Sequence, residues 1–324
     1  MRGRLASQLL SGPRARGPVE VAAQLLAVQA QDLRGARLVV RARTEGLSAG
    51  DVDRALTDER SLVISWLNRG TLHLVRSEDY RWLHALTTPQ LAAGNARRLA
   101  QEGVSLSAAE RGVAIVERAL ADEGPLTRLQ LRDRLRAENI RTEGQALVHI
   151  LMLASLRGIA VRGPIRDRQH AYALTHDWLG PARPFDREAA LRELGRRYLR
   201  GHAPADERDL AKWAGIPLRN ARAALAAART TPPPDAELPA PRLLGPFDAV
   251  LCGWTSRGWI LGSEEPAIVT GGLFRPFALV DGRAAAVWGF VDGQPKLAPL
   301  RRLTREERAA LDAEAADVVR FLAA

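Results

Sequence analysis

The stretch that decides the fold is DERDLAKWAGIPLRNARAAL, residues 206–225. Its first half predicts a short helix with one apolar face. Gly215 then provides a turn, and Pro217 opens a second helix, since proline is tolerated at the first helical position. Arg219 and Arg222 are expected to be exposed on that second helix. Two short helices joined by a tight turn with glycine form a helix-turn-helix, whose second helix commonly enters a DNA groove.

The same order of short helices followed by β structure occurs three times along the chain. The expected helices cover residues 18–31, 33–44, 48–58, 107–121, 126–138, 143–157, 186–200, 206–214 and 217–228. Strands follow the first group in SLVISW and TLHLV, around the turn LNRG, and the second group in GIAVRG and HAYAL, around the basic loop PIRDRQ. After the third group, VDGR and VDGQ each place Asp-Gly between apolar runs, which predicts tight hairpins.

Three helices closed by a β-hairpin form a winged helix. We therefore expect a mainly α fold with β-hairpins (α+β), built from tandem winged helix-turn-helix modules plus a C-terminal β-rich region. The expected modules are residues 1–87, 88–182 and 183–324, the last with a Pro-rich linker at 230–241 and a C-terminal helix. Many winged helices bind only protein, so the choice of partner depends on charge.

Capping boxes predict where three of the helices begin, because a hydroxyl and an acid or amide three residues later satisfy each other's backbone donors. The matching stretches are Ser107-Ala-Ala-Glu110, Thr142-Glu-Gly-Gln145 and Thr304-Arg-Glu-Glu307.

The charge balance favours a polyanion as partner. The 324 residues carry a formal net charge of +10 and a pI near 10.9. Of the 47 basic residues only Lys212 and Lys296 are lysine. A GC-rich genome explains arginine in place of lysine, but it does not explain the excess over 37 acidic residues. Arginine also pairs with phosphate and stacks on bases, so we expect double-stranded DNA as the partner.

Several other classes of function find no support in the sequence. Cys252 is the only cysteine, which excludes an intrachain disulfide and a cysteine-built zinc or iron–sulfur site. The histidines lack HExxH spacing, and GxxxxGK[ST] and GxSxG are absent. We expect no metal, no cofactor and no nucleotide. Without a long apolar run we also expect no membrane contact and a cytoplasmic location, with association to the nucleoid through DNA binding. We further expect a monomer.

The segment VQAQDLRG, residues 28–35, places Gln29 and Gln31 at alternate positions before Arg34, Arg37 and Arg41. On an intact helix two residues so spaced point about 200° apart, so a shared target requires the helix to end there. The three arginines, at spacings of three and four, would form one basic stripe beside the amides. The alternative is an ordinary helix end with solvated polar residues, where Asp32 is a cap or an ion-pair partner.

Five motifs in order carry a resemblance to a known family: VQAQD, WLNRGTLHLV, DLAKWAGIP, LLGPFDAVLCGW and FRPFALVDGR. Together they resemble the successive signatures of the AlkZ/YcaQ-type winged-helix DNA glycosylases, over most of the chain. The resemblance implies tandem winged helices around a basic surface and removal of N7-alkylated purines, including bulky or crosslinking natural-product adducts. Gln29-Ala30-Gln31 matches the family's Gln-x-Gln branch, which is similar to self-resistance enzymes of antibiotic producers. Trp288 is retained, while the basic residue that commonly follows it is not.

From the resemblance we expect a monofunctional DNA glycosylase, a hydrolase of N-glycosyl bonds, with Gln29 and Gln31 as catalytic residues. Candidate DNA contacts are Arg34, Arg37, Arg41, Asn68, Arg69, His73, Arg219 and Arg222. Asn68, Arg69 and His73 lie at or just after the first hairpin turn, where a wing reaches DNA, although plain turn and strand roles are an alternative for Arg69 and His73. The other candidate functions are a winged-helix transcription regulator and a catalytically silent DNA-binding relative.

Overall fold

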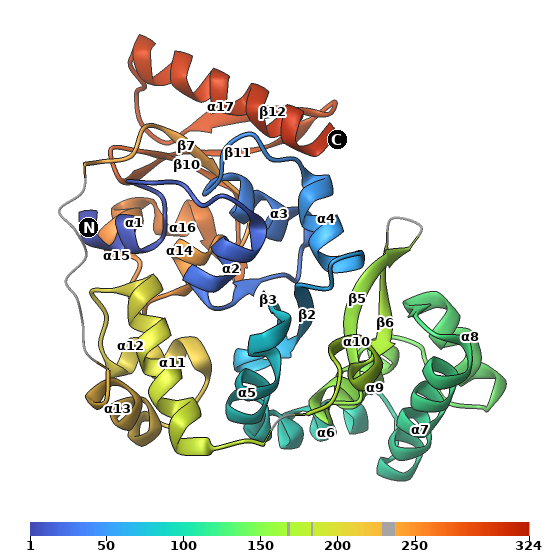
Figure 1. Cartoon of the computed structure of the whole chain (residues 1–324). Helices are drawn as coiled ribbons and strands as arrows, with labels where there is room; N and C mark the ends of the chain where they lie inside the picture. The colour runs from blue at the N-terminus through green and yellow to red at the C-terminus, as the bar shows by residue number, and fades with distance from the viewer. Residues whose placement is uncertain (167–168, 183, 229–236, 324) are drawn as a thin grey trace. The chain divides into compact units, whose positions relative to one another are not determined.

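The two ends of the chain form one compact unit, and its middle forms a second (Figure 1). The computed structural model describes residues 1–166, 169–182, 184–228 and 237–323. The terminal unit comprises Met1–Val52 and Leu191–Ala324, and the middle unit comprises Asp53–Ala190. The fold mixes helices with antiparallel sheets, as expected. None of the helices in the described ranges is both long and apolar enough to cross a membrane.

The two units cut the chain at positions other than the expected module boundaries of 87/88 and 182/183. The terminal unit is discontinuous because α1 (Arg2–Ser7) shares a core with segments near the C-terminus. A unit of this kind can hold more than one winged helix, so the three modules stay a prediction.

The middle unit contains strands in the order β3-β2-β5-β6-β4, and every described pair among them is antiparallel. Its strands are β2 (Leu62–Leu67), β3 (Thr71–Arg76), β4 (Leu126–Thr127), β5 (Ala160–Arg166) and β6 (Gln169–Leu174). Its helices are η1 (Asn68–Gly70), α5 (Ser77–Thr87), η2 (Pro89–Leu91), α6 (Ala92–Gln101), α7 (Leu106–Glu123), α8 (Arg128–Ala137), α9 (Ala146–Leu156) and α10 (Thr175–Leu179). Both expected hairpins are present, although residues 167 and 168 of the basic loop lie outside the described residues.

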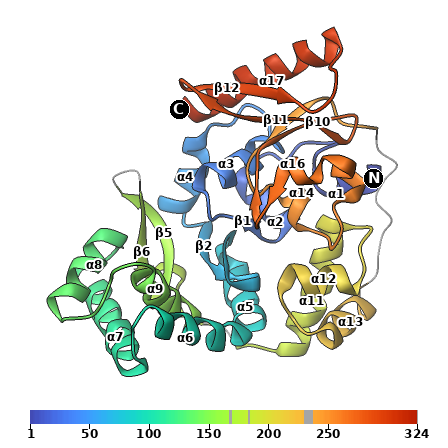
Figure 2. The same cartoon turned by 180° about the vertical axis from the view of Figure 1, so that it is seen from behind.

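The terminal unit contains a sheet in the order β12-β11-β10-β7, with α17 (Arg305–Ala323) along it (Figure 2). Its first part consists of α1, α2 (Pro18–Leu25), β1 (Val28–Gln29), α3 (Leu33–Arg41) and the start of α4 (Ala49–Thr57). Its second part contains α11 (Arg187–His202), which begins in the middle unit, α12 (Glu207–Ala214), α13 (Leu218–Ala226), β7 (Arg242–Leu244), α14 (Ala249–Cys252), α15 (Gly258–Leu261), η3 (Gly262–Glu264), α16 (Glu265–Ile268), β8 (Val269–Thr270), β9 (Leu273–Phe274), β10 (Phe277–Val280), β11 (Arg283–Val291) and β12 (Gln294–Pro299).

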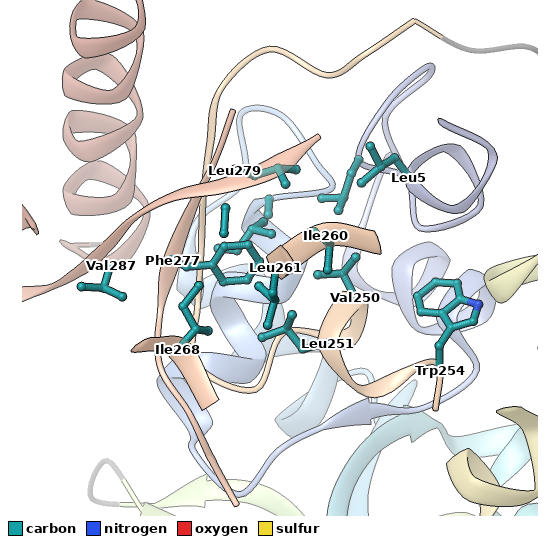
Figure 3. Close-up of a cluster of buried hydrophobic side chains, with 14 residues drawn as sticks. Leu5, Val250, Leu251, Trp254, Ile260, Leu261, Ile268, Phe277, Leu279 and Val287 are labelled. Atoms are coloured by element: carbon teal, nitrogen blue, oxygen red, sulfur yellow. The ribbon is translucent and has the colours of Figure 1, made fainter. Parts of the chain in front are cut away.

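Strand β10 is apolar on both faces because each face lines a different core. Phe277 and Leu279 point into a core with Leu5 and Val250 (Figure 3). Ala278, the residue between them, packs instead into the core beneath α17. Side chains alternate between the two sides of a strand, so a continuous apolar run is what a doubly covered strand requires. The N-terminal helix is therefore part of the same core as the C-terminal sheet.

The Asp-Gly hairpins form as predicted. β10 and β11 are joined through Asp281 and Gly282, with φ of 50° and 74°, and β11 and β12 through Asp292 and Gly293, with φ of 49° and 76°. Positive φ at both central residues matches the tight turn that Asp-Gly favours. The predicted linker at 230–241 lies mostly outside the described residues, which resume at 237.

The helix-turn-helix is confirmed at the level of the backbone. α12 ends at Gly215, which takes a left-handed φ of 69°, and Pro217 is the N-cap of α13. One predicted capping box is also confirmed: the Thr304 amide donates to Glu307 Oε2 at 2.8 Å, and the Glu307 amide donates to Thr304 Oγ1 at 3.1 Å.

The other two predicted capping boxes are wrong, because neighbouring groups compete for the same bonds. α7 begins after Ser105, whose hydroxyl accepts from the Ala108 amide, two residues before the predicted start. The hydroxyl of Thr142 accepts instead from Arg136 Nε at 2.8 Å, so α9 begins only at Ala146.

Candidate active site

The Gln-x-Gln segment is not helical, and a helix over 18–31 is wrong. α2 ends at Leu25, and Leu26 takes a left-handed φ of 65° that the helix cannot continue. Gln29 lies in strand β1. Residues two apart on extended backbone point to the same side. The helix therefore ends before the two glutamines, which is the condition for them to share a target.

Gln29 and Gln31 contact each other directly. Nε2 of Gln29 donates to Oε1 of Gln31 at 2.7 Å. Gln29 is buried, with 8% of its surface exposed, whereas Gln31 is exposed. The thiol of Cys252, at the end of α14, donates to Oε1 of Gln29 at 3.5 Å. A short chain of hydrogen bonds thus runs from a partly buried thiol to an amide in solvent.

Asp32 acts as a helix cap, as one of the sequence alternatives expects. Its Oδ1 accepts from the Gly35 amide at 3.1 Å, and α3 begins at the next residue, Leu33. A side-chain acceptor there satisfies a backbone donor that the first turn leaves open. The cap fixes the direction in which the chain leaves Gln31.

The loop before α14 packs tightly against α3, the helix that follows the glutamines. A Cβ on Gly35 would lie 2.8 Å from the carbonyl oxygen of Pro246, and one on Gly245 would lie 2.8 Å from Cβ of Leu38. Only glycine allows both close approaches. In the same loop Phe247 takes a left-handed φ of 56° and stacks on Phe274 with ring centroids 5.5 Å apart. This loop places α14, and with it Cys252, beside β1.

A buried ion pair links α14 to the chain that follows α3. Nη2 of Arg43 lies 2.8 Å from Oδ1 of Asp248, and Nη1 lies 3.0 Å from Oδ2, with neither side chain exposed. Arg43 also donates to the carbonyl oxygens of Gln8 and Val39, and Asp248 accepts from the Val250 amide. A buried pair is tolerated when such additional bonds satisfy its remaining donors and acceptors.

The expected basic stripe is wrong at Arg41. Only 2% of its side chain is exposed, and it lies 2.7 Å from Glu314 and 2.9 Å from Asp317 of α17. The burial follows from the amphipathic pattern of α3, which directs this position toward α17. Arg34 is exposed, with its guanidinium 5.0 Å from the ring centroid of Phe290 on β11, and Arg37 is half-buried.

Of the three candidate DNA contacts at the first hairpin, two are buried. Asn68 is fully buried, and His73 is 2% exposed with Nδ1 2.9 Å from the Thr71 carbonyl oxygen. Burial, with nearby Arg69, lowers the pKa of His73 to about 3, so its ring is neutral near pH 7. Neither Asn68 nor His73 is therefore presented at the surface for the expected DNA contact, and His73 has the position of an ordinary strand residue in β3. Arg69 is half-buried at the turn, with φ 53°.

The two arginines of α13 are exposed, as expected. Arg222 lies 3.5 Å from Glu207 of α12, and this pair is open to solvent at 62% and 37% of the two side chains. Such an exposed pair holds its charges loosely, because water screens the attraction. Arg219 and Arg222 thus remain candidates for a phosphate contact.

A hollow of about 680 Å³ in the middle unit contains none of the predicted site residues. Trp82, Trp178 and Arg60 are among its lining residues, and the Arg60 guanidinium lies 4.3 Å from the Trp178 ring centroid. Within the described part of the chain, no group of three or more His, Cys, Asp or Glu side chains is placed to hold a metal ion.

Sequence reasoning missed Arg43, Asp248, Cys252 and Phe290 as neighbours of the site. Asp248 and Cys252 both lie in the motif LLGPFDAVLCGW, but Cys252 is 223 residues from Gln29 along the chain. No local pattern indicates that these two stretches meet. The motif LLGPFDAVLCGW therefore indicated the family, but it did not indicate that Cys252 contacts Gln29.

Comparisons with known proteins find similar proteins over most of the chain. The family described as DNA glycosylase AlkZ-like matches residues 22–321. The interstrand DNA cross-link repair glycosylase of Streptomyces sahachiroi is 27% identical over 338 residues, covering 93% of this chain and 90% of that protein. The solved structure of Streptomyces sahachiroi DNA glycosylase AlkZ superposes with a TM-score of 0.75 at 24% identity, covering 98% of this chain and 94% of that one, which shows a shared fold. This chain belongs to the AlkZ-like family of DNA glycosylases, which are hydrolases acting on N-glycosyl bonds.

Proposed function

We propose that this enzyme hydrolyses the N-glycosidic bond of N7-alkylated purines in duplex DNA, including bulky or crosslinking adducts, for repair or self-resistance. The observation that carries the proposal is the neutral pair of Gln29 and Gln31, whose amides lie 2.7 Å apart at a surface. The likeness to a cross-link repair glycosylase supports crosslinked DNA as a substrate class.

The chemistry of the substrate explains why amides suffice. Alkylation at N7 gives the purine a positive charge, so the base leaves as a neutral molecule and needs little help from a general acid. The enzyme has to supply a positioned water and to stabilise a sugar with oxocarbenium character. An amide oxygen can accept a hydrogen bond from water and can direct its negative end toward the cationic sugar.

The two glutamines take different parts in this proposal because their exposure differs. Gln31 is exposed, and its Oε1, which accepts from Gln29, keeps a second lone pair for water or sugar. Gln29 is buried and orients Gln31 through that bond. A carboxylate in place of Gln31 would attract the cation more strongly and could act as a base. The amide pair therefore suits labile cationic adducts, and unmodified purines should be inert.

DNA binding in this proposal comes from exposed arginines on winged-helix modules. Arg34 lies three residues from Gln31, and Arg219 and Arg222 lie on the second helix of the helix-turn-helix. A net charge of +10 supports a surface that holds phosphates. We propose that a single copy of the chain binds the duplex through such contacts.

The test is a base-release assay on a duplex that contains one N7-methylguanine. The wild-type enzyme should release the methylated base and leave an alkali-sensitive abasic site. The matched control is the same duplex with guanine at that position, which should stay intact. A set of duplexes with larger N7 adducts and with an N7–N7 crosslink then defines the range of substrates.

Two outcomes would contradict the proposal. Binding of adducted DNA without release from any of these duplexes would indicate a silent DNA-binding relative. Release of the unmodified guanine at a comparable rate would show that the site does not depend on a cationic leaving group.

A further inference from the structure

We propose that Cys252 is a positioning residue for Gln29, because its thiol sets the orientation of the Gln29 amide. This inference rests on the proposed function of the glutamine pair. It assigns a role in the reaction to the one cysteine of the chain.

A side-chain amide has to be oriented, because its two ends have similar shapes and opposite hydrogen-bonding roles. The last torsion of glutamine is broad and roughly two-fold, so rotation by 180° exchanges Oε1 with Nε2 at little cost. In the exchanged orientation Oε1 of Gln29 would face Oε1 of Gln31, and two acceptors would oppose each other. The productive orientation, with Nε2 toward Gln31, needs a donor on the opposite side of Gln29.

Cys252 provides that donor. Its Sγ lies 3.5 Å from Oε1 of Gln29 and 3.9 Å from the carbonyl oxygen of Phe247. Both atoms are acceptors, so the sulfur acts as an S–H donor toward either of them. The direction of the whole chain is then fixed: thiol to Gln29, and Gln29 to Gln31.

The backbone around Cys252 holds the thiol in place. α14 is only four residues long, and it is capped by the preceding residue, Asp248, which pairs with the buried Arg43. At the other end of the helix, Gly253 follows Cys252 and packs closely on His202. A Cβ on Gly253 would lie only 2.5 Å from the His202 ring. The thiol is thus carried by a short, doubly anchored helix.

Substitution at Cys252 separates the loss of a donor from the loss of a side chain. Cys252→Ala removes the donor, and Cys252→Ser keeps one. In single-turnover release from an N7-methylguanine duplex, the alanine variant should be about threefold to tenfold slower, the size of one weak neutral hydrogen bond. The serine variant should recover most of the wild-type rate. The affinity for DNA and the melting temperature should stay unchanged in both. The matched control is Ser256→Ala, an exposed position four residues further on, which should keep the wild-type rate.

A double-mutant cycle tests whether Cys252 acts through Gln29. The double variant Cys252→Ala with Gln29→Ala should be as slow as Gln29→Ala alone, since the thiol then has no amide to orient. A purely structural role would instead multiply the two losses. Because the chain has one cysteine, methyl methanethiosulfonate modifies this thiol selectively. The treatment should slow the wild-type enzyme, dithiothreitol should restore it, and Cys252→Ser should not respond.

The results distinguish this inference from the proposed function. Wild-type enzyme that releases no base from any N7-alkylated duplex overturns the proposed function. Wild-type enzyme that releases base, with equal rates for Cys252→Ala or losses that multiply in the cycle, overturns only the role of Cys252. If Cys252→Ala does not fold, modification of folded wild-type enzyme decides: an unchanged rate after complete thiol modification overturns the inference.

Discussion

Arg43 and Asp248 form a two-point ion pair in the interior of the terminal unit, with distances of 2.8 and 3.0 Å and no exposure of either side chain. Arg43 follows α3, and Asp248 caps α14. Those two helices flank the segment that carries Gln29 and Gln31. The pair therefore joins the two parts of the chain whose contact creates the candidate site.

Removing one partner of this pair should strongly destabilise the terminal unit. Arg43→Ala leaves the carboxylate of Asp248 buried without its counter-charge, which costs about 3–5 kcal/mol. The free energy of unfolding, measured with denaturant, reports the loss. Arg16→Ala is the control, because its pair with Glu20 is exposed and contributes less than about 1 kcal/mol. Similar decreases in the free energy of unfolding for the two variants would mean that the buried pair stabilises the protein no more than the exposed pair does.

Alanine at either glutamine should slow base release without weakening DNA binding, because the arginines supply the binding. In other enzymes, loss of one hydrogen bond that stabilises the transition state slows the reaction roughly 10²–10³-fold. An N7-alkylated base departs easily, so we expect each alanine variant to release it only about 10–100-fold more slowly. Single-turnover kinetics on an N7-methylguanine duplex measures the effect. If both variants keep the wild-type rate and melt normally, the pair is only a chain turn and the chemistry belongs to other residues.

Gln31→Asp should test whether the site works with a carboxylate in place of the second amide. The shorter acid keeps an acceptor at this exposed position and adds a base and a negative charge. We expect release to be faster than in Gln31→Ala on the same duplex. Gln31→Glu is the comparison, since its extra methylene relative to Asp shifts the charge. A rate for Gln31→Asp no higher than for Gln31→Ala would show that this site cannot use an acid.

Arg34 and Arg41 should behave differently although both lie on α3. Arg34 is exposed, so Arg34→Ala should flatten the slope of log K against log salt by about one unit if it contacts a phosphate. Arg219→Ala should act likewise. Arg41→Ala should leave the slope unchanged and lower the stability, since Arg41 pairs with Glu314 and Asp317. Unchanged slopes for both Arg34→Ala and Arg219→Ala would show that neither residue contacts a phosphate and that DNA binds to another surface.

Stability should fall in mild acid because His202 is buried as a neutral ring. Burial lowers its pKa from 6.5 to about 4. As the pH falls below 6.5, the histidine becomes protonated in the unfolded chain, whereas in the folded chain it stays neutral until about pH 4. The free energy of unfolding therefore decreases between pH 6.5 and pH 4, by about 3 kcal/mol. Denaturant unfolding from pH 7 to pH 4 measures this decrease. His202→Gln should show a shallower decrease, and an equal slope would assign the effect to other groups.

Local chemistry allowed several elements to be predicted from the sequence. Gly215 and Pro217 end one helix and open the next, and each Asp-Gly pair fits the two positive φ angles of a tight hairpin. These features depend on residues a few positions apart. The first helix is a contrasting case, because it was expected to run to residue 31 and it ends at Leu25.

Competition between neighbouring groups limited even these local predictions. The hydroxyl of Thr142 bonds to Arg136 and so does not cap the next helix. Such a choice depends on which partner lies nearer in the folded chain, and the sequence alone does not rank them.

The tertiary structure alone decided which charged and polar residues are available for function. Arg34 and Arg41 look equivalent in sequence, but α17 packs over one of them and leaves the other in solvent. Cys252 reaches Gln29 across 223 residues because the loop before α14 packs closely on α3 through Gly35 of the helix and Gly245 of the loop. The sequence by itself determined the helix-turn-helix, the hairpins and the chemical identity of the glutamine pair, since these follow from short-range conformational preferences. Burial, ion pairing and the contact between thiol and amide follow from long-range packing, which no local pattern encodes.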